Sequence, residues 1–194
     1  MSHHIYHTEA FILDSRESGE ANRTFSFFTR ELGLVVATAQ GVRLLKSKLR
    51  YTLQDYSHVK VDLVRGREIW RVTSGGPTPP QLAHDILVPL YARVCKLVLR
   101  LCHGEEKNEE LFDTMLDFFH YSESVDAETV EKYFAPLEIV LVLKVLHTLG
   151  YIGDSSIIDL FISKKFGEIN LQNVMSQKNV FVSYINLALS ESHL

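Results

Sequence analysis

The sequence predicts an α+β protein in which a small closed β-barrel precedes a helical domain. Two observations support this prediction. Residues 1–75 contain five short segments with strand character, and a Gly- and Pro-rich stretch at 74–80 ends that pattern. Beyond it, apolar residues recur at helical spacing. We expect a barrel at 1–75, a linker at 76–80 and a helical domain at 81–194. We expect the sheet to close into a barrel because the open edges of a small sheet are prone to aggregate.

The five predicted strands are short and rich in aromatic and β-branched residues. The fourth alternates most clearly, with Val59, Val61 and Leu63 on one face and polar residues on the other. We expect Phe25 and Phe27 in the barrel core and Phe28, which is out of phase, at the surface. The predicted strands are Tyr6–Asp14, Arg23–Thr29, Leu34–Gln40, Tyr56–Val64 and Glu68–Thr73.

The helical half contains five predicted helices. Asp126 is placed to cap the third at its start and Gly150 to end it, whereas Pro136 inside it predicts a split or a kink. The predicted helices are Leu82–His103, Asn108–Tyr121, Asp126–Leu149, Ser155–Phe161 and Ser176–Leu189.

Composition indicates an ordinary globular chain of 194 residues, 46% of them apolar, with a formal net charge of −4. No apolar run is long enough for a membrane span, no signal peptide is recognisable, and two cysteines do not make a disulfide framework. We therefore expect a cytoplasmic protein without a membrane partner.

Charge is unevenly distributed along the chain. Residues 1–75 carry eleven Lys/Arg against eight Asp/Glu, whereas 76–194 carry nine against sixteen. This asymmetry predicts an anionic partner for the first part.

The predicted binding residues lie around a basic stretch between the third and fourth strands. It contains Arg43, Lys46, Lys48 and Arg50, and we expect it to be exposed because unpaired charges are not buried. Such side chains can follow a phosphate backbone, and aromatic neighbours can stack on bases. Tyr51 and Tyr56 flank the stretch and Trp70 lies two strands later, while Arg65, Arg67 and Arg71 extend the positive face. An ordinary solvated loop is the alternative interpretation.

Several short motifs in this region follow the pattern of a known family. They are Gly19-Glu20, Phe28-Thr29-Arg30-Glu31, Gly33, Gly41, Arg43, Lys46-Ser47-Lys48, Leu53-Gln54 and Gly66-Arg67. At this spacing the segment 17–72 resembles the N-terminal domain of the RecO recombination mediators, which are bacterial DNA repair proteins. Lys48 replaces the usual arginine and Asp55-Tyr56 the usual Pro-Phe. LFDTMLDFF and VLKVLHTLGY resemble the helical part more loosely, so the resemblance covers residues 5 to about 153.

The resemblance implies an OB-fold joined to a helical domain. It implies binding to single- and double-stranded DNA, strand annealing, and loading of the RecA recombinase together with RecR. It also implies contact with the acidic tail of single-stranded DNA-binding protein, although Lys144 is the only basic residue of LEIVLVLK, where some members carry more. Many members have a four-cysteine zinc site after Leu149-Gly150-Tyr151; it is missing here, so no metal is expected.

No nucleotide-binding, protease or hydrolase motif is present, so we expect no catalytic residues and no cofactor. The sequence therefore favours a DNA-binding recombination mediator. In this interpretation Arg43, Lys46, Lys48 and Arg50 contact phosphates, and Tyr51 stacks on a base. The second interpretation is a protein–protein adaptor of the repair machinery with little DNA binding of its own.

Overall fold

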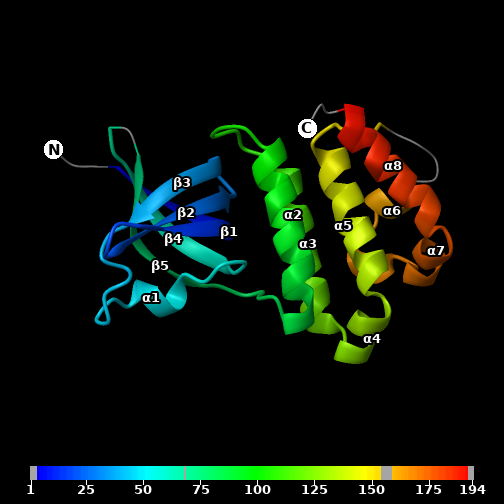
Figure 1. The fold of residues 1–194 in the computed structure, drawn as a ribbon, viewed down its shortest axis with the longest axis horizontal. Helices are drawn as coiled ribbons and strands as arrows, with labels where there is room; N and C mark the ends of the chain where they lie inside the picture. Colours follow the sequence, from blue (N-terminus) through cyan, green and yellow to red (C-terminus); the bar gives the residue numbers. More distant parts are fainter. Residues whose placement is uncertain (1–3, 68, 154–158, 192–194) are drawn as a thin grey trace. The chain divides into compact units, whose positions relative to one another are not determined.

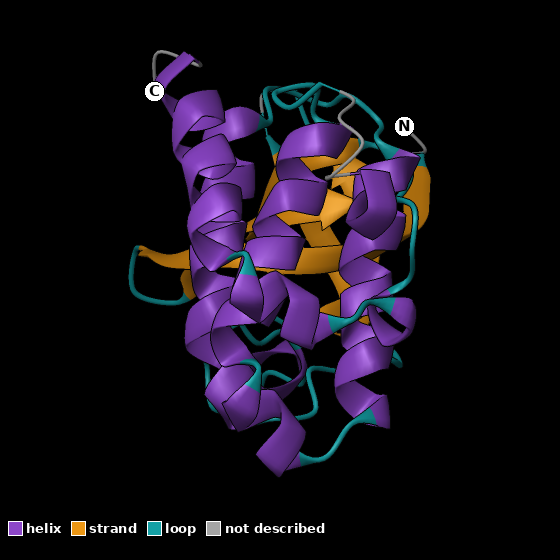
Figure 2. Cartoon of the chain, turned by 90° about the vertical axis from the view of Figure 1, so that its right-hand side faces the viewer, coloured by secondary structure: helices purple, strands orange, loops and turns teal. Residues whose placement is uncertain are grey.

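The computed structural model describes residues 4–67, 69–153 and 159–191. The chain divides into two compact units. The first comprises residues 1–81 together with 95–112, and the second comprises 82–94 together with 113–194. Strands belong to the first unit and most helical residues to the second, which confirms the predicted α+β class (Figure 1; strands are orange and helices purple in Figure 2).

Five strands form a closed barrel in the order β1-β2-β3-β5-β4. The pair β3 and β5 is parallel and the other pairs are antiparallel. A short helix, α1 (Leu49–Thr52), lies between β3 and β4, which gives the OB-like architecture. The strands are β1 (Ile5–Ser18), β2 (Asn22–Thr29), β3 (Gly33–Ala39), β4 (His58–Arg65) and β5 (Trp70–Pro77).

The long first strand makes closure possible. β1 pairs with β4 through Ile5–Phe11 and with β2 through Ala10–Ser18, so it belongs to both sides of the barrel. Its register against β2 shifts between Ile12 and Asp14. A bulge of this kind bends and twists a strand, as a closed sheet requires. The sequence predicted the start of β1 but not its extension to Ser18.

The barrel interior is filled by the alternating apolar residues of all five strands. Phe25 and Phe27 lie inside as predicted, with ring centroids 5.6 Å apart. Two residues outside the strands, Val42 and Leu53, complete this core. The other members are Ala10, Ile12, Val35, Ala37, Ala39, Val59, Val61, Leu63, Trp70 and Val72.

A second apolar layer covers part of the outer surface of the barrel. Phe11 and Phe28 point out of the interior and pack against Phe112, with centroids 4.9 and 6.2 Å away. The guanidinium of Arg30 also lies over the ring of Phe112, 4.3 Å from its centroid. The expectation that Phe28 is exposed was therefore wrong, since its side chain is 1% exposed. Phe28 does point out of the barrel interior, as its position in the alternation predicted, but Phe112, 84 residues further along the chain, covers it there.

Gly33 permits the loop after α2 (Val88–Leu101) to approach the barrel. Its φ is +69°, and a Cβ built there would lie 2.1 Å from the carbonyl oxygen of Glu106. Gly19 has a similar φ of +67° but open space around it. Gly33 is therefore required by a backbone contact as well as by a left-handed conformation.

The helices are η1 (Asp85–Leu87), α2 (Val88–Leu101), α3 (Glu109–Ser124), α4 (Ala127–Lys132), α5 (Phe134–Thr148), α6 (Asp159–Ile162), η2 (Phe166–Glu168), α7 (Leu171–Ser176) and α8 (Lys178–Glu191). α5 lies against α6, α7 and α8. The first part of the helix predicted at 155–161 lies outside the described residues. The helix predicted at 176–189 is confirmed as α8, with α7 before it.

The predicted split of the helix from Asp126 is confirmed, but the break lies at Tyr133 rather than at Pro136. Pro136 therefore stands in the first turn of α5, where an N–H has no helical acceptor. Asp126 caps α4 by accepting a hydrogen bond from the Thr129 N–H at 2.8 Å. Gly150 follows α5 with a φ of +78°, as expected of a helix end.

Lys144 is buried within α5 and has a structural role. Its Nζ donates hydrogen bonds to the carbonyl oxygens of Ile162 and Lys164, both at 2.6 Å. The ammonium also lies 5.6 Å from the ring centroid of Phe166. These contacts hold the segment after α6 against α5.

Alanine at position 33 should destabilise the barrel more than alanine at position 19. Both variants acquire left-handed strain, but only Gly33→Ala clashes with the Glu106 backbone. We expect a loss of about 2–5 kcal/mol for Gly33→Ala against about 1–2 kcal/mol for Gly19→Ala in urea denaturation. Equal losses would contradict the close approach of residue 106.

Stability should fall as the pH drops below about 6.5, partly because of His58. The ring is buried, stacks on Phe11 at 4.8 Å, and lies 3.9 Å from Glu9. Burial lowers its pKa, with Glu9 opposing and Arg30 reinforcing the shift. The unfolded state then binds the proton more readily, so acid favours unfolding. His58→Phe should reduce the fall in unfolding free energy between pH 7 and pH 5, and parallel curves would exclude His58 as a cause.

Candidate nucleic-acid interface

The basic stretch lies in the connection between β3 and β4, which is tied to the barrel at both ends. Val42 and Leu53 are buried in the barrel core, and α1 lies between them. The Arg43 N–H donates to the Ala21 carbonyl at 2.9 Å, and the Thr52 hydroxyl donates to the Gly75 carbonyl at 3.3 Å. This connection is therefore an ordered part of the barrel surface.

Arg43 and Arg50 are partly engaged in holding this connection. Arg43 forms a 2.9 Å ion pair with Glu17 and donates to the Gly19 carbonyl at 3.0 Å. Arg50 in turn donates to the carbonyl of Arg43 at 3.2 Å and lies 5.8 Å from the ring centroid of Tyr51. Both guanidiniums keep free N–H groups, since each carries five donors.

A cavity of about 380 Å³ opens beside these arginines. Its wall also contains Arg23, which was not predicted as a site residue and forms a 3.1 Å ion pair with Asp55. Three guanidiniums thus face one hollow, together with the carboxylates of Glu17 and Glu20. The acids offset much of the local positive charge, so the cavity alone is a weak anion site.

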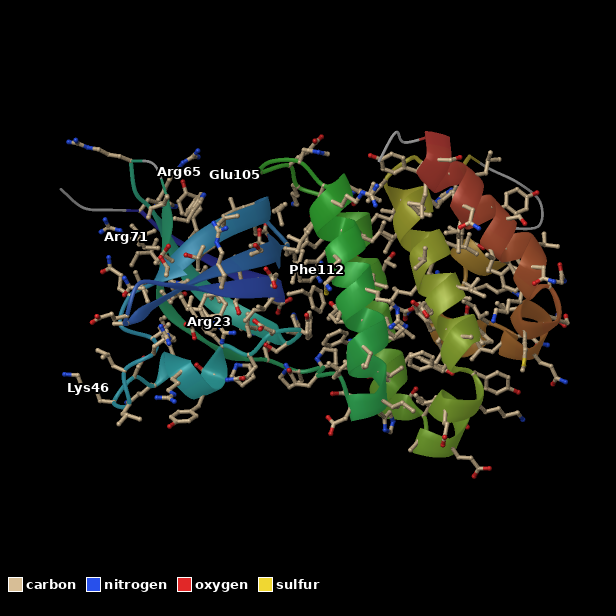
Figure 3. The ribbon with its side chains drawn as sticks, in the orientation of Figure 1. Arg23, Lys46, Arg65, Arg71, Glu105 and Phe112 are labelled. Atoms are coloured by element: carbon tan, nitrogen blue, oxygen red, sulfur yellow. The ribbon has the colours of Figure 1, made fainter. Side chains whose placement is uncertain are left out.

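Lys46, Lys48 and Tyr51 are exposed in the same connection. Neither lysine forms an ion pair with any residue that the structure describes. Figure 3 shows Lys46 directed away from the barrel. The Tyr51 side chain is 68% exposed. These three side chains are free to contact a polyanion and its bases.

The predicted arginines of the β4–β5 hairpin lie apart from this group. Figure 3 shows Arg65 at the upper edge of the barrel, Lys46 at the lower left and Arg71 at the left between them. Arg65 forms a 3.3 Å ion pair with Glu105 and lies 5.4 Å from the ring centroid of Trp70. Arg67 and Arg71 are exposed and form no ion pair with a described residue. The eight predicted residues therefore come from two segments, the β3–β4 connection and the β4–β5 hairpin with the start of β5.

Trp70 is unsuited to base stacking in this conformation. Its side chain is 5% exposed, and its indole N–H donates to a carboxylate oxygen of Glu105 at 2.8 Å. Glu105 thus joins Trp70 and Arg65 from a loop 35 residues further along the chain. The contact of Glu105 with Trp70 and Arg65 could not be predicted, because the two segments lie far apart in sequence and no local pattern in either indicates it.

Metal sites, membrane-spanning helices and reactive cysteines have little support in the described part of the chain. It contains no group of three or more metal-ligating side chains and no helix long and apolar enough to cross a membrane. Burial and Glu106 raise the pKa of the Cys102 thiol to about 11, and Cys95 is buried, so both cysteines are poor nucleophiles.

Comparison with known proteins agrees with this architecture. Residues 1–79 match the family described as Recombination protein O N terminal. The DNA repair protein RecO of Pelotomaculum thermopropionicum is 33% identical over 150 residues, 76% of this chain and 56% of that protein. Its counterpart in Desulfitobacterium hafniense strain DCB-2 is 30% identical over 76% of this chain and 52% of that protein. The chain thus spans about half the length of these relatives.

Removing the Glu105 carboxylate should be detectable through Trp70, the only tryptophan of the chain. Glu105→Ala leaves the indole N–H without its acceptor, so we expect a loss of about 1 kcal/mol in unfolding free energy and a shifted emission maximum. Glu105→Gln retains an acceptor oxygen and should emit like the native protein. Identical spectra for all three proteins would contradict the hydrogen bond.

Proposed function

Because the chain belongs to the RecO family, we propose that it is a non-enzymatic DNA-binding mediator of recombinational repair in the cytoplasm. Its relatives are named DNA repair proteins. The single observation that carries the proposal is that Lys46 and Lys48 are exposed on the β3–β4 connection of an OB-like barrel and form no ion pair with a described residue. Barrels of this class bind single strands through positive grooves and stacked aromatic residues.

In the proposed mechanism the connection between β3 and β4 follows the phosphate backbone. Lys46 and Lys48 neutralise phosphates directly, while Arg43 and Arg50 use the guanidinium donors that their internal contacts leave free. Tyr51 stacks on a base. Neutralisation of two complementary strands lowers their repulsion and so favours annealing.

The second group, formed by Arg65, Arg67 and Arg71, extends contact to another part of a long strand or to a duplex. Arg65 contributes less than its charge suggests because Glu105 compensates it. The proposed protein partners are RecR and, through RecR, the RecA recombinase. Contact with the acidic tail of single-stranded DNA-binding protein would require cations other than Lys144, whose ammonium binds backbone carbonyls.

A protein–protein adaptor is the second candidate function. The observation that favours it is the pairing of Arg23, Arg43 and Arg65 with carboxylates, which leaves the barrel less positive than its composition suggests. Retention of RecR binding without any oligonucleotide binding would select this function.

The double variant Lys46→Ala/Lys48→Ala tests the DNA-binding proposal. Loss of two phosphate contacts should weaken binding to a single-stranded oligonucleotide several-fold. It should also reduce the slope of log K against log salt by about 1.4, since each contact on a single strand contributes about 0.7. Fluorescence anisotropy at several salt concentrations measures both quantities.

The matched control is Lys164→Ala/Lys165→Ala, which removes the same charge from two exposed positions of the helical unit. This variant should bind like the native protein. If both double variants change affinity equally, net charge rather than the β3–β4 connection determines binding, and the site assignment fails.

A further inference from the structure

We propose that Leu44 and Leu45 form an apolar wedge that inserts between stacked bases of bound nucleic acid. The inference rests on the proposed DNA-binding function and adds a specific action to it. The protein would not only follow the phosphate backbone but also locally separate the bases that the backbone carries.

The two leucines are unusually exposed for adjacent large aliphatic residues. Their relative exposures are 45% for Leu44 and 83% for Leu45. Full burial of a leucine side chain is worth about 1.5–3 kcal/mol, and this pair does not obtain that stabilisation within the fold. Together with Tyr51 they give the connection an apolar surface that a binding partner can cover.

The backbone presents these side chains in a defined conformation. The Leu44 N–H donates to the Gly41 carbonyl at 3.1 Å, and the Ser47 N–H donates to the Leu44 carbonyl at 2.9 Å. The Gly41 N–H is held in turn by the Asn22 side chain at 2.9 Å. A tip ordered in advance loses little conformational entropy on insertion.

The neighbouring charges favour nucleic acid over a protein as the occupant. Residues 41–54 contain four basic and no acidic side chains. Lys46 follows the leucines directly and Lys48 stands two residues further on, and each base step in a strand is flanked by phosphates. Lysine is depleted at protein–protein interfaces, whereas phosphate contacts require it. Leucine is among the residues that DNA-bending proteins insert between base steps.

The test uses short duplexes in which 2-aminopurine replaces one adenine, at a different position in each duplex. This base fluoresces weakly when stacked and strongly when unstacked. Saturating native protein should raise the fluorescence several-fold at one or more positions. Leu44→Ala/Leu45→Ala should abolish most of this rise at equal saturation, while the slope of log K against log salt stays unchanged because the lysines remain.

Leu187→Ala is the matched control, since Leu187 is 56% exposed on α8 and lies far from residue 45 in sequence. It should behave like the native protein. Both leucines of the wedge are exposed, and urea denaturation verifies that the double variant is folded.

The possible results separate the wedge from the proposed function. Native protein that binds duplex with a normal salt slope but leaves every 2-aminopurine quenched overturns the wedge alone, and assigns the leucines to a protein partner. An unchanged rise in the double variant also overturns it. Native protein that binds neither duplex nor single strand overturns both the wedge and the DNA-binding proposal.

Discussion

The candidate interface depends on the burial of two apolar residues that belong to no strand. Val42 and Leu53 lie in the barrel core and fix the two ends of a segment that would otherwise be a free loop. Leu53 also contacts the backbone region of Gly75, where a Cβ would lie 3.2 Å from its Cδ2. Between these anchors Leu49 also packs against the core, whereas Lys46, Lys48 and Arg50 are exposed. Hydrophobic burial thus determines where the cations are displayed.

The overall charge of −4 does not conflict with binding to a polyanion. At physiological ionic strength exposed charges are screened beyond about 8 Å, so a phosphate responds to the few groups nearest to it. Near Lys46 and Lys48 the sequence offers no acid between residues 41 and 54. In contrast, the cavity around Arg23 contains Glu17 and Glu20, which reduce its attraction for anions.

Local patterns predicted most of the fold because they report directly on burial. Alternation of Val59, Val61 and Leu63 predicted β4, and Asp126 as a helix-capping residue predicted the start of α4. Contacts between distant segments could not be predicted in this way. The burial of Phe28 by Phe112, the pairing of Arg23 with Asp55, and the bond from Trp70 to Glu105 each join residues 32 to 84 positions apart. Periodicity contains no information about such pairs.

The same limit applies to the pairing of the basic residues with acids. The sequence gives the number of basic residues, but not which of them are paired with carboxylates in the fold. Arg43 and Arg65 each have a carboxylate within 3.3 Å, with which a phosphate would have to compete. Lys46 and Lys48 form no ion pair with a carboxylate among the described residues. Two lysines that look ordinary in the sequence are therefore less compensated by nearby acids than Arg43 and Arg65.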